Sequence, residues 1–296
     1  MWFIVGGDSE IGAATYRHLR AKGQAVTAST RRPERVAADR PLLDLSQALD
    51  DWEPPTGTHG ACISAAVARL GACQLNPSES EHINVKQTLA IIERLIARGI
   101  YVLFLSTNQV FDGETPYVAT NAPTCPVSEY GRQKACAEAL LYGHMARGAP
   151  IAVLRLAKVV TPGMELIRNW RKALLAGEPI RAFHDMQMAP TPIDIVVETI
   201  SNLMADSARG IFQLSGPFDI SYLQVGLYVA EQVGAKRSLV EPVSARSFGL
   251  PLGSTPRHTT LDSEILRSRY SLAAPDPWAV VDSIMKPDAV VNPFES

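Results

Sequence analysis

The sequence predicts an α/β protein in which a doubly wound parallel sheet carries a smaller, interleaved lobe. Short apolar runs alternate with helical patterns, a glycine-rich turn follows the first run, and Pro162-Gly163 interrupts the alternation. Strands that alternate with helices pair in parallel, because the helices are the crossover connections. We expect residues 1–162 and 191–216 to form the sheet domain, and residues 163–190 and 217–285 to form the smaller lobe.

Composition bounds the class of protein. A chain of 296 residues that is 46% apolar and 20% charged can bury a sizeable core in one large or two modest domains. The net charge of −2 gives no electrostatic basis for binding nucleic acid or an anionic membrane surface. No basic segment precedes an apolar run at the start, and no apolar stretch approaches the ~18 residues of a membrane helix. We therefore expect a cytoplasmic protein without membrane or nucleic-acid partners.

The cysteines Cys62, Cys73, Cys125 and Cys136 lack the paired spacing of metal ligands. Cys62 lies in an apolar run and is expected to be a small core residue. The sequence thus predicts free thiols in a reducing compartment and no metal site.

The first strand is expected at residues 2–5, and residues 6–12 then read Gly-Gly-Asp-Ser-Glu-Ile-Gly before a helix that stops at Gly23. In such a turn, backbone N–H groups and the helix dipole can approach a pyrophosphate. The spacing fits Gly-x-x-Gly-x-x-Gly, except that Ser9 takes the middle position. Its side chain leaves slightly less room for a pyrophosphate to approach the backbone. Its place between a strand and a helix strengthens a signal that is weak alone. We expect the sheet domain to bind a dinucleotide here.

The second strand, at residues 25–29, ends in Thr30-Arg31-Arg32 instead of an acidic residue. A carboxylate at this point would hold the ribose hydroxyls of NAD, whereas arginines accommodate a 2′-phosphate. Arg31 and Arg32 therefore favour NADP(H) over NAD(H). The alternative is a solvated basic loop.

Two further strands are expected at residues 41–45 and 60–66. The first places Asp44 near the position of an adenine. The second ends in small residues, including Ala65 and Ala66, which leave room for a cofactor to pass over the strand end.

A helix should begin at Asn76 or Ser80 and end at Gly99, because apolar residues recur at helical spacing between them. Asn84 is polar at the start of this apolar stripe. It is either a buried amide with satisfied hydrogen bonds or a side chain that holds the backbone of an active site.

An apolar strand at residues 101–105 leads into Ser106 and Thr107, so that it delivers hydroxyls to the edge of the sheet. The next helix carries Tyr130 and Lys134 four residues apart, on one face. A phenol with a pKa of about 10 is a poor proton donor at neutral pH, and a fixed ammonium beside it lowers that pKa. Thr107 could hold a carbonyl oxygen while Tyr130 protonates it, with the hydride coming from a nicotinamide. The Tyr-x-x-x-Lys spacing also arises by chance among half-buried surface residues, so its weight depends on this context.

The remaining chain gives further elements. We expect strands at residues 151–154, 180–183 and 211–214, helices at 166–175, 193–203, 222–233 and 262–267, and a final helix that carries Trp278, Val281 and Ile284. Residues 186–192 and 239–258 are expected to be irregular, and the tail after Lys286 to be loosely held. Candidates to meet a diphosphate or a sugar are Arg181, His184, Arg257 and His258, each of which is alternatively a solvated loop residue.

The segments Ser106-Thr107-Asn108-Gln109-Val110-Phe111-Asp112-Gly113 and Tyr130-Gly131-x-x-Lys134 carry a family likeness. Over nearly its whole length, the chain resembles the extended short-chain dehydrogenase/reductases, and within them the dTDP-4-dehydrorhamnose reductase-like, sugar nucleotide-binding group. The resemblance implies a Rossmann-type domain, NADP(H) and a nucleotide-linked keto sugar. It makes Thr107, Tyr130 and Lys134 the catalytic trio. The expected cofactor-binding residues are Gly6, Ser9, Glu10, Ile11, Gly12, Arg31, Arg32, Asp44, Leu45, Ala65, Ala66, Tyr130 and Lys134, together with the stretch after Leu156.

The chain departs from that group at Asn108 and Gln109, where the family usually has an acid and an aromatic residue. Asn108 cannot transfer a proton, which disfavours the elimination of water that related dehydratases perform.

The sequence therefore predicts an NADPH-dependent reductase of a nucleotide-linked 4-keto sugar, with Tyr130 as the proton donor. One alternative is a non-catalytic, NADP-binding regulatory subunit that resembles the subunit of methionine adenosyltransferase, and another is a sugar-nucleotide epimerase. The expected partner is a nucleotide sugar, and a homodimer is one possible assembly.

Overall fold

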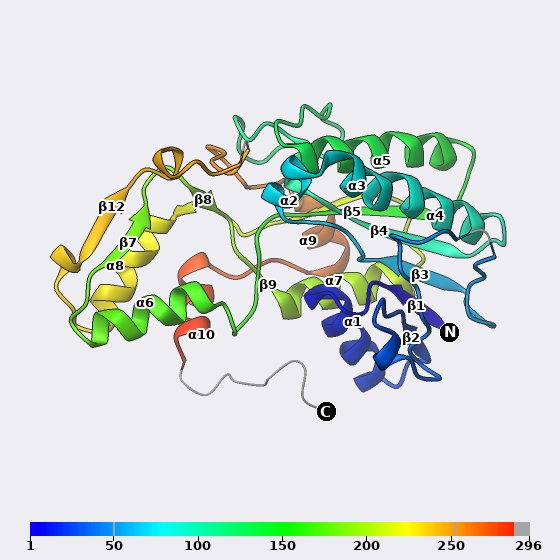
Figure 1. Ribbon diagram of the computed structural model, residues 1–296, viewed down its shortest axis with the longest axis horizontal. Coiled ribbons are helices and arrows are strands. Elements are labelled where there is room, and N and C mark those ends of the chain that lie inside the picture. The colour runs from blue at the N-terminus through cyan, green and yellow to red at the C-terminus, as the bar shows by residue number, and fades with distance from the viewer. Residues whose placement is uncertain (50, 252, 287–296) are drawn as a thin grey trace.

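A six-stranded parallel sheet forms the larger part of the molecule, as the computed structural model shows (Figure 1). The structure describes residues 1–49, 51–251 and 253–286. The strand order is β10-β5-β4-β3-β1-β2, and every pair in this sheet is parallel. The strands are β1 (Trp2–Val5), β2 (Val26–Ala28), β3 (Gly60–Ile63), β4 (Tyr101–Thr107), β5 (Ile151–Leu156) and β10 (Gly210–Leu214). The predicted doubly wound parallel sheet is confirmed.

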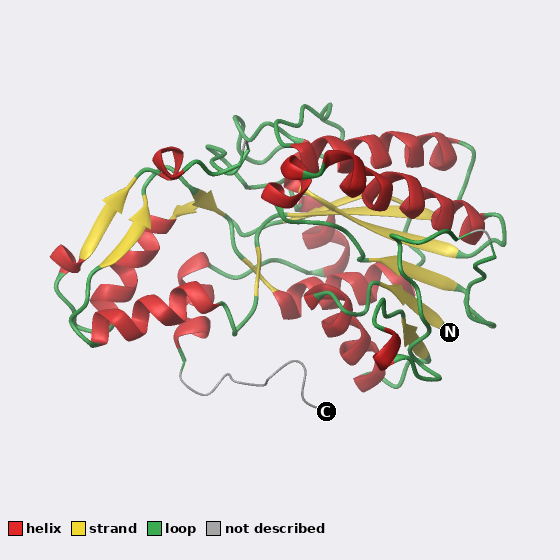
Figure 2. Cartoon of the chain, in the orientation of Figure 1, coloured by secondary structure: helices red, strands yellow, loops and turns green. Residues whose placement is uncertain are grey.

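Helices cover both faces of this sheet (Figure 2). Helices α1 (Glu10–Ala21) and α7 (Ile193–Ala205) lie on one face, where Ile4 of β1 shares an apolar cluster with Val196 of α7. Helices α4 (Thr88–Ile96) and α5 (Glu129–Ala146) lie on the other face, where Phe3 packs with Ile91 of α4. Neighbouring residues of β1 thus point to opposite faces, and both faces are buried.

The order of the strands reverses next to β1, because β2 lies on one side of it and β3 on the other. In open α/β sheets, ligands bind beyond the carboxyl ends of the strands at such a switch point. This places the expected dinucleotide site at the turn that follows β1.

The smaller lobe is built on α6 (Glu165–Leu175), α8 (Tyr222–Gln232), α10 (Pro277–Met285) and the paired strands β7 (Ile180–Phe183) and β12 (Val240–Val243). Trp170, Val225 and Val281 share its apolar cluster. Helix α9 (Glu264–Tyr270) packs elsewhere, because Leu266 belongs to the cluster of the sheet domain. The division of the chain at 163–190 and 217–285 stays a prediction, with α9 as an element that contacts the sheet domain.

Two predicted segments differ from the structure. Residues 41–45, predicted as a strand, make only an isolated bridge between Leu42 and Thr30, because Pro41 has no N–H with which to extend a ladder. The stretch 239–258, predicted to be irregular, contains β12, which pairs in parallel with the predicted strand β7. Pro242 lies within this strand, and a proline in a short run argues against predicting a strand there.

Very short elements also escaped prediction. Residues 186–192, expected to be a loop, include β8 (Gln187–Met188) and β9 (Thr191–Pro192), which pair with β11 (Ile220–Ser221) and β6 (Val159–Val160). Helix α2 (Leu70–Leu75) precedes α3 (Pro77–Glu81), whose N-cap is Asn76, one of the two predicted starts. Strands of two residues are too short to show a repeating pattern.

Several expectations concern the whole chain. The four cysteines are free thiols, of which Cys62 and Cys73 are buried. None of the described helices has the length and apolarity of a membrane span. The predicted loose tail after Lys286 lies outside the described residues.

Candidate active site

The turn after β1 depends on glycine, because its backbone approaches the ends of neighbouring strands closely. Gly6 has a φ of +95°, and a Cβ on it would lie 2.5 Å from the backbone nitrogen of Ala65, so only glycine fits. Its N–H donates to the Ser29 Oγ (2.9 Å). The turn therefore packs directly against the ends of β2 and β3.

Ser9 is the N-cap of α1. Its Oγ accepts a hydrogen bond from the Gly12 N–H (3.0 Å) and donates to the carbonyl of Gly6 (2.8 Å). A Cβ on Gly12 would collide with that carbonyl. Serine at the middle position of the motif thus caps the helix, a role that the sequence analysis did not assign.

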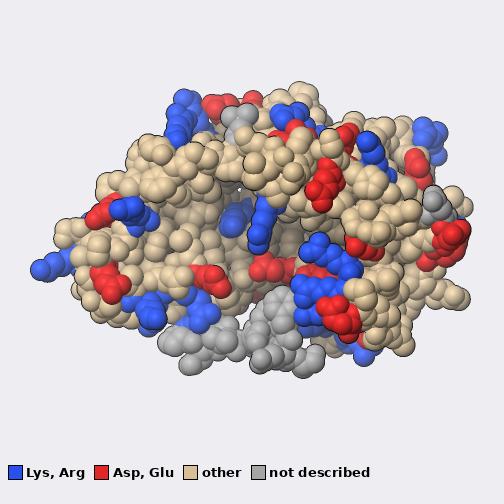
Figure 3. Space-filling view, in the orientation of Figure 1, with Lys and Arg blue, Asp and Glu red and all other residues tan. Residues whose placement is uncertain are grey.

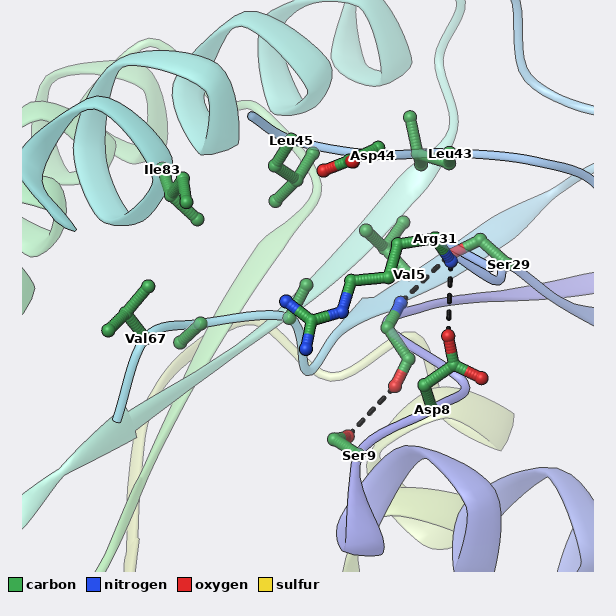
Figure 4. Close-up of a pocket in the computed structure, with 13 residues that line it drawn as sticks. Val5, Asp8, Ser9, Ser29, Arg31, Leu43, Asp44, Leu45, Val67 and Ile83 are labelled. Carbon is green, nitrogen blue, oxygen red and sulfur yellow. Dashed lines mark hydrogen bonds between the residues drawn. The ribbon is translucent and has the colours of Figure 1, made fainter. Parts of the chain in front are cut away.

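The first cavity, of about 220 Å³, lies at the carboxyl ends of β1, β2 and β3 (Figure 4). Seven predicted cofactor residues line it: Gly6, Ser9, Arg31, Asp44, Leu45, Ala65 and Ala66. The predicted residues Glu10, Ile11, Gly12 and Arg32 are not part of its lining. Glu10 and Arg32 are exposed, Ile11 packs toward the core of the sheet domain, and Gly12 is buried beneath the turn.

Arg31 extends its guanidinium into the first cavity, and Asp8 lies beside the base of that side chain (Figure 4). The Asp8 carboxylate accepts hydrogen bonds from the Thr30 hydroxyl (2.8 Å) and the Arg31 N–H (3.0 Å). Its Oδ1 is buried and has no hydrogen-bond partner among the described residues, although Arg35 lies 3.9 Å away. The cavity therefore offers the Arg31 cation, the unpaired Asp8 oxygen and the N–H groups of the glycine turn. These groups suit the phosphates and hydroxyls of a dinucleotide. Asp8 was not predicted from the sequence, although an acid inside the turn was a visible signal.

Asn84 holds the backbone at the rim of this cavity. It lies in a π-helical turn (His82–Gln87), a distortion that is frequent at functional sites. Its Oδ1 accepts from the Val67 N–H (2.8 Å), and its Nδ2 donates to the Val67 carbonyl (3.0 Å) and to the Gln133 Oε1 (2.8 Å). Both interpretations of Asn84 thus hold, since it is a satisfied buried amide that also fixes backbone lining the cavity.

The second cavity, of about 240 Å³, lies where the carboxyl ends of β4 and β5 face the smaller lobe. The space-filling view shows a hollow between the two parts of the molecule, with basic side chains at its edge (Figure 3). Thr107 and Tyr130 line the cavity from the sheet domain, and Gln187, Met188 and Tyr222 line it from the other side. The structure therefore brings together two of the three predicted catalytic residues.

Thr107 and its neighbours are linked by hydrogen bonds. The Thr107 hydroxyl donates to the Asn108 Oδ1 (3.4 Å) and accepts from the Gln109 N–H (3.2 Å). The Gln109 side chain accepts from the Ser128 hydroxyl (3.1 Å) and donates to the Gly253 carbonyl (3.4 Å). Asn108 and Gln109 thus orient this strand end and connect it to a distant segment.

Lys134 lines neither cavity. Its Nζ donates to the Leu105 carbonyl (2.6 Å) and lies 3.7 Å from the centre of the Phe104 ring. Burial lowers the pKa of Lys134 to about 7, and the nearby Glu138 carboxylate opposes this shift. The cation is therefore held behind the strand end that carries Thr107.

The pKa of Tyr130 is shifted in the opposite direction from the one predicted. Burial, followed by the charge of Cys73, raises the pKa of Tyr130 well above its ordinary value. The expectation that a neighbouring ammonium lowers this pKa is wrong for the present structure, because desolvation dominates. Tyr130 keeps its proton at neutral pH, as an unperturbed phenol does, and the raised pKa makes it a weaker acid than the sequence analysis expected.

The basic residues proposed from the sequence to meet a diphosphate or a sugar lie outside both cavities. Arg181 is 3.6 Å from Glu241, Arg257 is 3.4 Å from Glu114, and His258 is 3.2 Å from Asp219. His184 is exposed. Among the described residues, no group of three His, Cys, Asp or Glu side chains is placed to hold a metal ion.

The six-stranded parallel sheet, with two cavities at the carboxyl ends of its strands, defines an α/β protein of the Rossmann type. The chain belongs to the family described as the RmlD substrate binding domain, whose family model matches residues 1–287.

Two relatives and one solved structure are similar to the chain over most of its length. The probable low-salt glycan biosynthesis reductase Agl14 of Haloferax volcanii is 26% identical, over 92% of this chain and 93% of the relative. The methionine adenosyltransferase 2 subunit beta of Xenopus tropicalis is 23% identical, over 86% of this chain and 77% of the relative. The crystal structure of a hypothetical dTDP-4-dehydrorhamnose reductase from Sulfolobus tokodaii has a TM-score of 0.77 at 20% identity, over 95% of this chain and 98% of that chain. The structural likeness establishes the shared fold.

Proposed function

We propose that the protein is an NADPH-dependent reductase that acts on a nucleotide-linked 4-keto sugar. The observation that carries this proposal is the second cavity, in which Thr107 and Tyr130 meet at the carboxyl end of the sheet. The family membership and the names of the Haloferax and Sulfolobus relatives support a reductase of sugar nucleotides.

The first cavity would hold the dinucleotide. The glycine turn and the N-terminus of α1 would bind its diphosphate, because N–H groups and the helix dipole favour an anion there. Arg31, which lines the cavity, is the cation for a 2′-phosphate and favours NADPH. The Asp8 carboxylate lies close to the same position and weakens this preference.

Reduction of the carbonyl adds a hydride to its carbon and a proton to its oxygen. The bound nicotinamide supplies the hydride. The Thr107 hydroxyl orients the carbonyl oxygen, and the Tyr130 phenol, which holds its proton at neutral pH, donates that proton to it. Lys134 lies one helical turn from Tyr130 and supports the phenolate that remains, provided that its own ammonium is charged.

A second candidate function is a non-catalytic, NADP-binding regulatory subunit. The similarity to the methionine adenosyltransferase 2 subunit beta favours it, and so does the engagement of Thr107 with Asn108. Such a subunit would bind the cofactor and associate stoichiometrically with a partner enzyme, without turnover of its own.

The two functions are distinguished by incubating the purified chain with NADPH and a panel of dTDP- and UDP-linked 4-keto sugars. A reductase consumes NADPH in the presence of at least one of these sugars and forms the corresponding alcohol. If NADPH binds but no member of the panel is reduced, while a partner enzyme co-purifies in a fixed ratio, the regulatory function holds instead.

A further inference from the structure

Lys158 is the only charged residue among the described residues that line the second cavity. No carboxylate lines this cavity, and no ion pair joins Lys158 to a described Asp or Glu. The side chain is exposed. The cavity therefore contains an uncompensated positive charge next to Thr107 and Tyr130.

The backbone fixes the position of this charge. Strand β5 ends at Leu156, which is paired in register with Thr107 at the end of β4, and Lys158 follows two residues later. The Lys158 carbonyl accepts a hydrogen bond from the Thr191 N–H (2.8 Å). Lys158 thus enters the cavity from the strand adjacent to the one that carries Thr107.

The other candidates for binding an anion are absent from this cavity. Arg181, Arg257 and His258 are paired with carboxylates elsewhere, and Arg31 lines the first cavity. The remaining lining is neutral and includes the apolar side chains of Met186 and Met188 and the phenol of Tyr222. The cavity thus offers one point charge, from Lys158, to a negatively charged group of the substrate.

We propose that Lys158 binds a carboxylate carried by the sugar ring, so that the second cavity selects nucleotide-linked uronic acids over the corresponding neutral sugars. This inference rests on the proposed function, because it identifies the substrate class of the same site. The ammonium pairs with the carboxylate while Thr107 and Tyr130 face the reacting oxygen. A charge-assisted hydrogen bond of this kind favours the anionic sugar by about ten-fold or more in affinity.

The test is a comparison of UDP-glucuronic acid with UDP-glucose, which share a nucleotide and a diphosphate and differ in the carboxylate. Their dissociation constants are measured by calorimetry on the full chain saturated with NADP⁺. The wild-type protein is expected to bind UDP-glucuronic acid about ten-fold or more tightly than UDP-glucose, and the preference should shrink at high salt.

Three variants complete the test. Lys158→Met should remove the preference while affinity for UDP-glucose stays within about two-fold, because a neutral sugar does not use this charge. Lys158→Arg should retain the preference, and Lys236→Met, at an exposed site outside both cavities, should behave as wild type. Thermal unfolding verifies that each variant is folded.

The other outcomes overturn the inference. Equal losses for both sugars in Lys158→Met would assign the lysine to the diphosphate, and an unchanged preference would remove it from recognition altogether. If the wild-type protein binds both sugars equally, only this inference fails. If it binds neither of them nor any other nucleotide sugar while still binding NADP⁺, the proposed function fails with it.

Discussion

At the scale of single residues, burial governs the chemistry of the site. Desolvation raises the pKa of Tyr130 and lowers that of Lys134, so both groups favour their uncharged forms. A neutral phenol is the competent proton donor, whereas a neutral amine cannot support the phenolate that forms. The raised pKa makes the phenol a weaker acid, and the lowered pKa of Lys134 reduces the charge that would offset this, so both shifts oppose proton donation.

This difference predicts a pH dependence. The pKa of Lys134 is about 7, so its ammonium is charged below that value and loses its proton as the pH rises through it. Tyr130 keeps its proton throughout this range because its pKa is raised. We expect kcat/KM for reduction to fall as the pH rises through about 7. A profile measured from pH ~5 to ~9 checks this, and a value that stays constant to pH ~9 would mean that Lys134 keeps the ordinary lysine pKa of about 10.4.

The sequence identified part of this chemistry. The spacing of Tyr130 on a helix and the hydroxyl at the end of an apolar strand were sufficient to predict that Tyr130 and Thr107 share a cavity. Lys158 was not identified, because its importance depends on which side chains lie around it in space. The pKa of Tyr130 was predicted in the wrong direction, since the sequence does not reveal how strongly the neighbouring groups desolvate a side chain.

At the scale of elements, the turn that begins α1 has two roles. It forms one wall of the first cavity, and Ser9 caps the helix that follows. Because the Ser9 hydroxyl also binds the Gly6 carbonyl, stability and cavity shape depend on the same side chain.

Substitution of Ser9 separates these roles. Ser9→Ala removes the cap and should lower the free energy of unfolding by about 1 kcal/mol. Ser9→Gly should lower it by only about 0.3 kcal/mol, because glycine is tolerated at N-caps. Ser9→Gly also restores the three-glycine spacing and is expected to leave NADPH affinity intact. Urea denaturation and NADPH titration of both variants give the measurements. Equal stability of the alanine variant and the wild type would show that the cap is not energetically important.

The predictability of elements followed the length of their apolar runs. The central strands, such as β4, were evident because both faces of the sheet are buried and the runs are continuous. The segment 41–45 was overestimated, since its apolar residues do not reveal that Pro41 interrupts the ladder. The π-helical turn around Asn84 was invisible, because a single extra residue per turn leaves no clear periodicity.

At the scale of the whole molecule, the two cavities lie along one edge of the sheet and are served by different parts of the chain. The first cavity is built from the sheet domain, whereas the second also includes residues of the smaller lobe such as Tyr222. Hydrogen bonds tie the two parts together near the second cavity, since the Gln109 side chain donates to the Gly253 carbonyl (3.4 Å) and the Tyr117 N–H donates to the Thr260 hydroxyl (3.2 Å). Binding of the dinucleotide and the chemistry of the sugar are thus assigned to separable groups of residues.

The measurement that tests this assignment most directly is a comparison of NADPH affinity and turnover in Tyr130→Phe, with Tyr228→Phe in α8 as the matched control. Tyr130 lines the second cavity and not the first, so its hydroxyl should matter for the proton and not for holding the cofactor. We expect kcat to fall by about 10²- to 10⁴-fold in Tyr130→Phe, with the dissociation constant for NADPH unchanged, and we expect the control to retain full activity. Turnover by Tyr130→Phe at the wild-type rate would contradict the account.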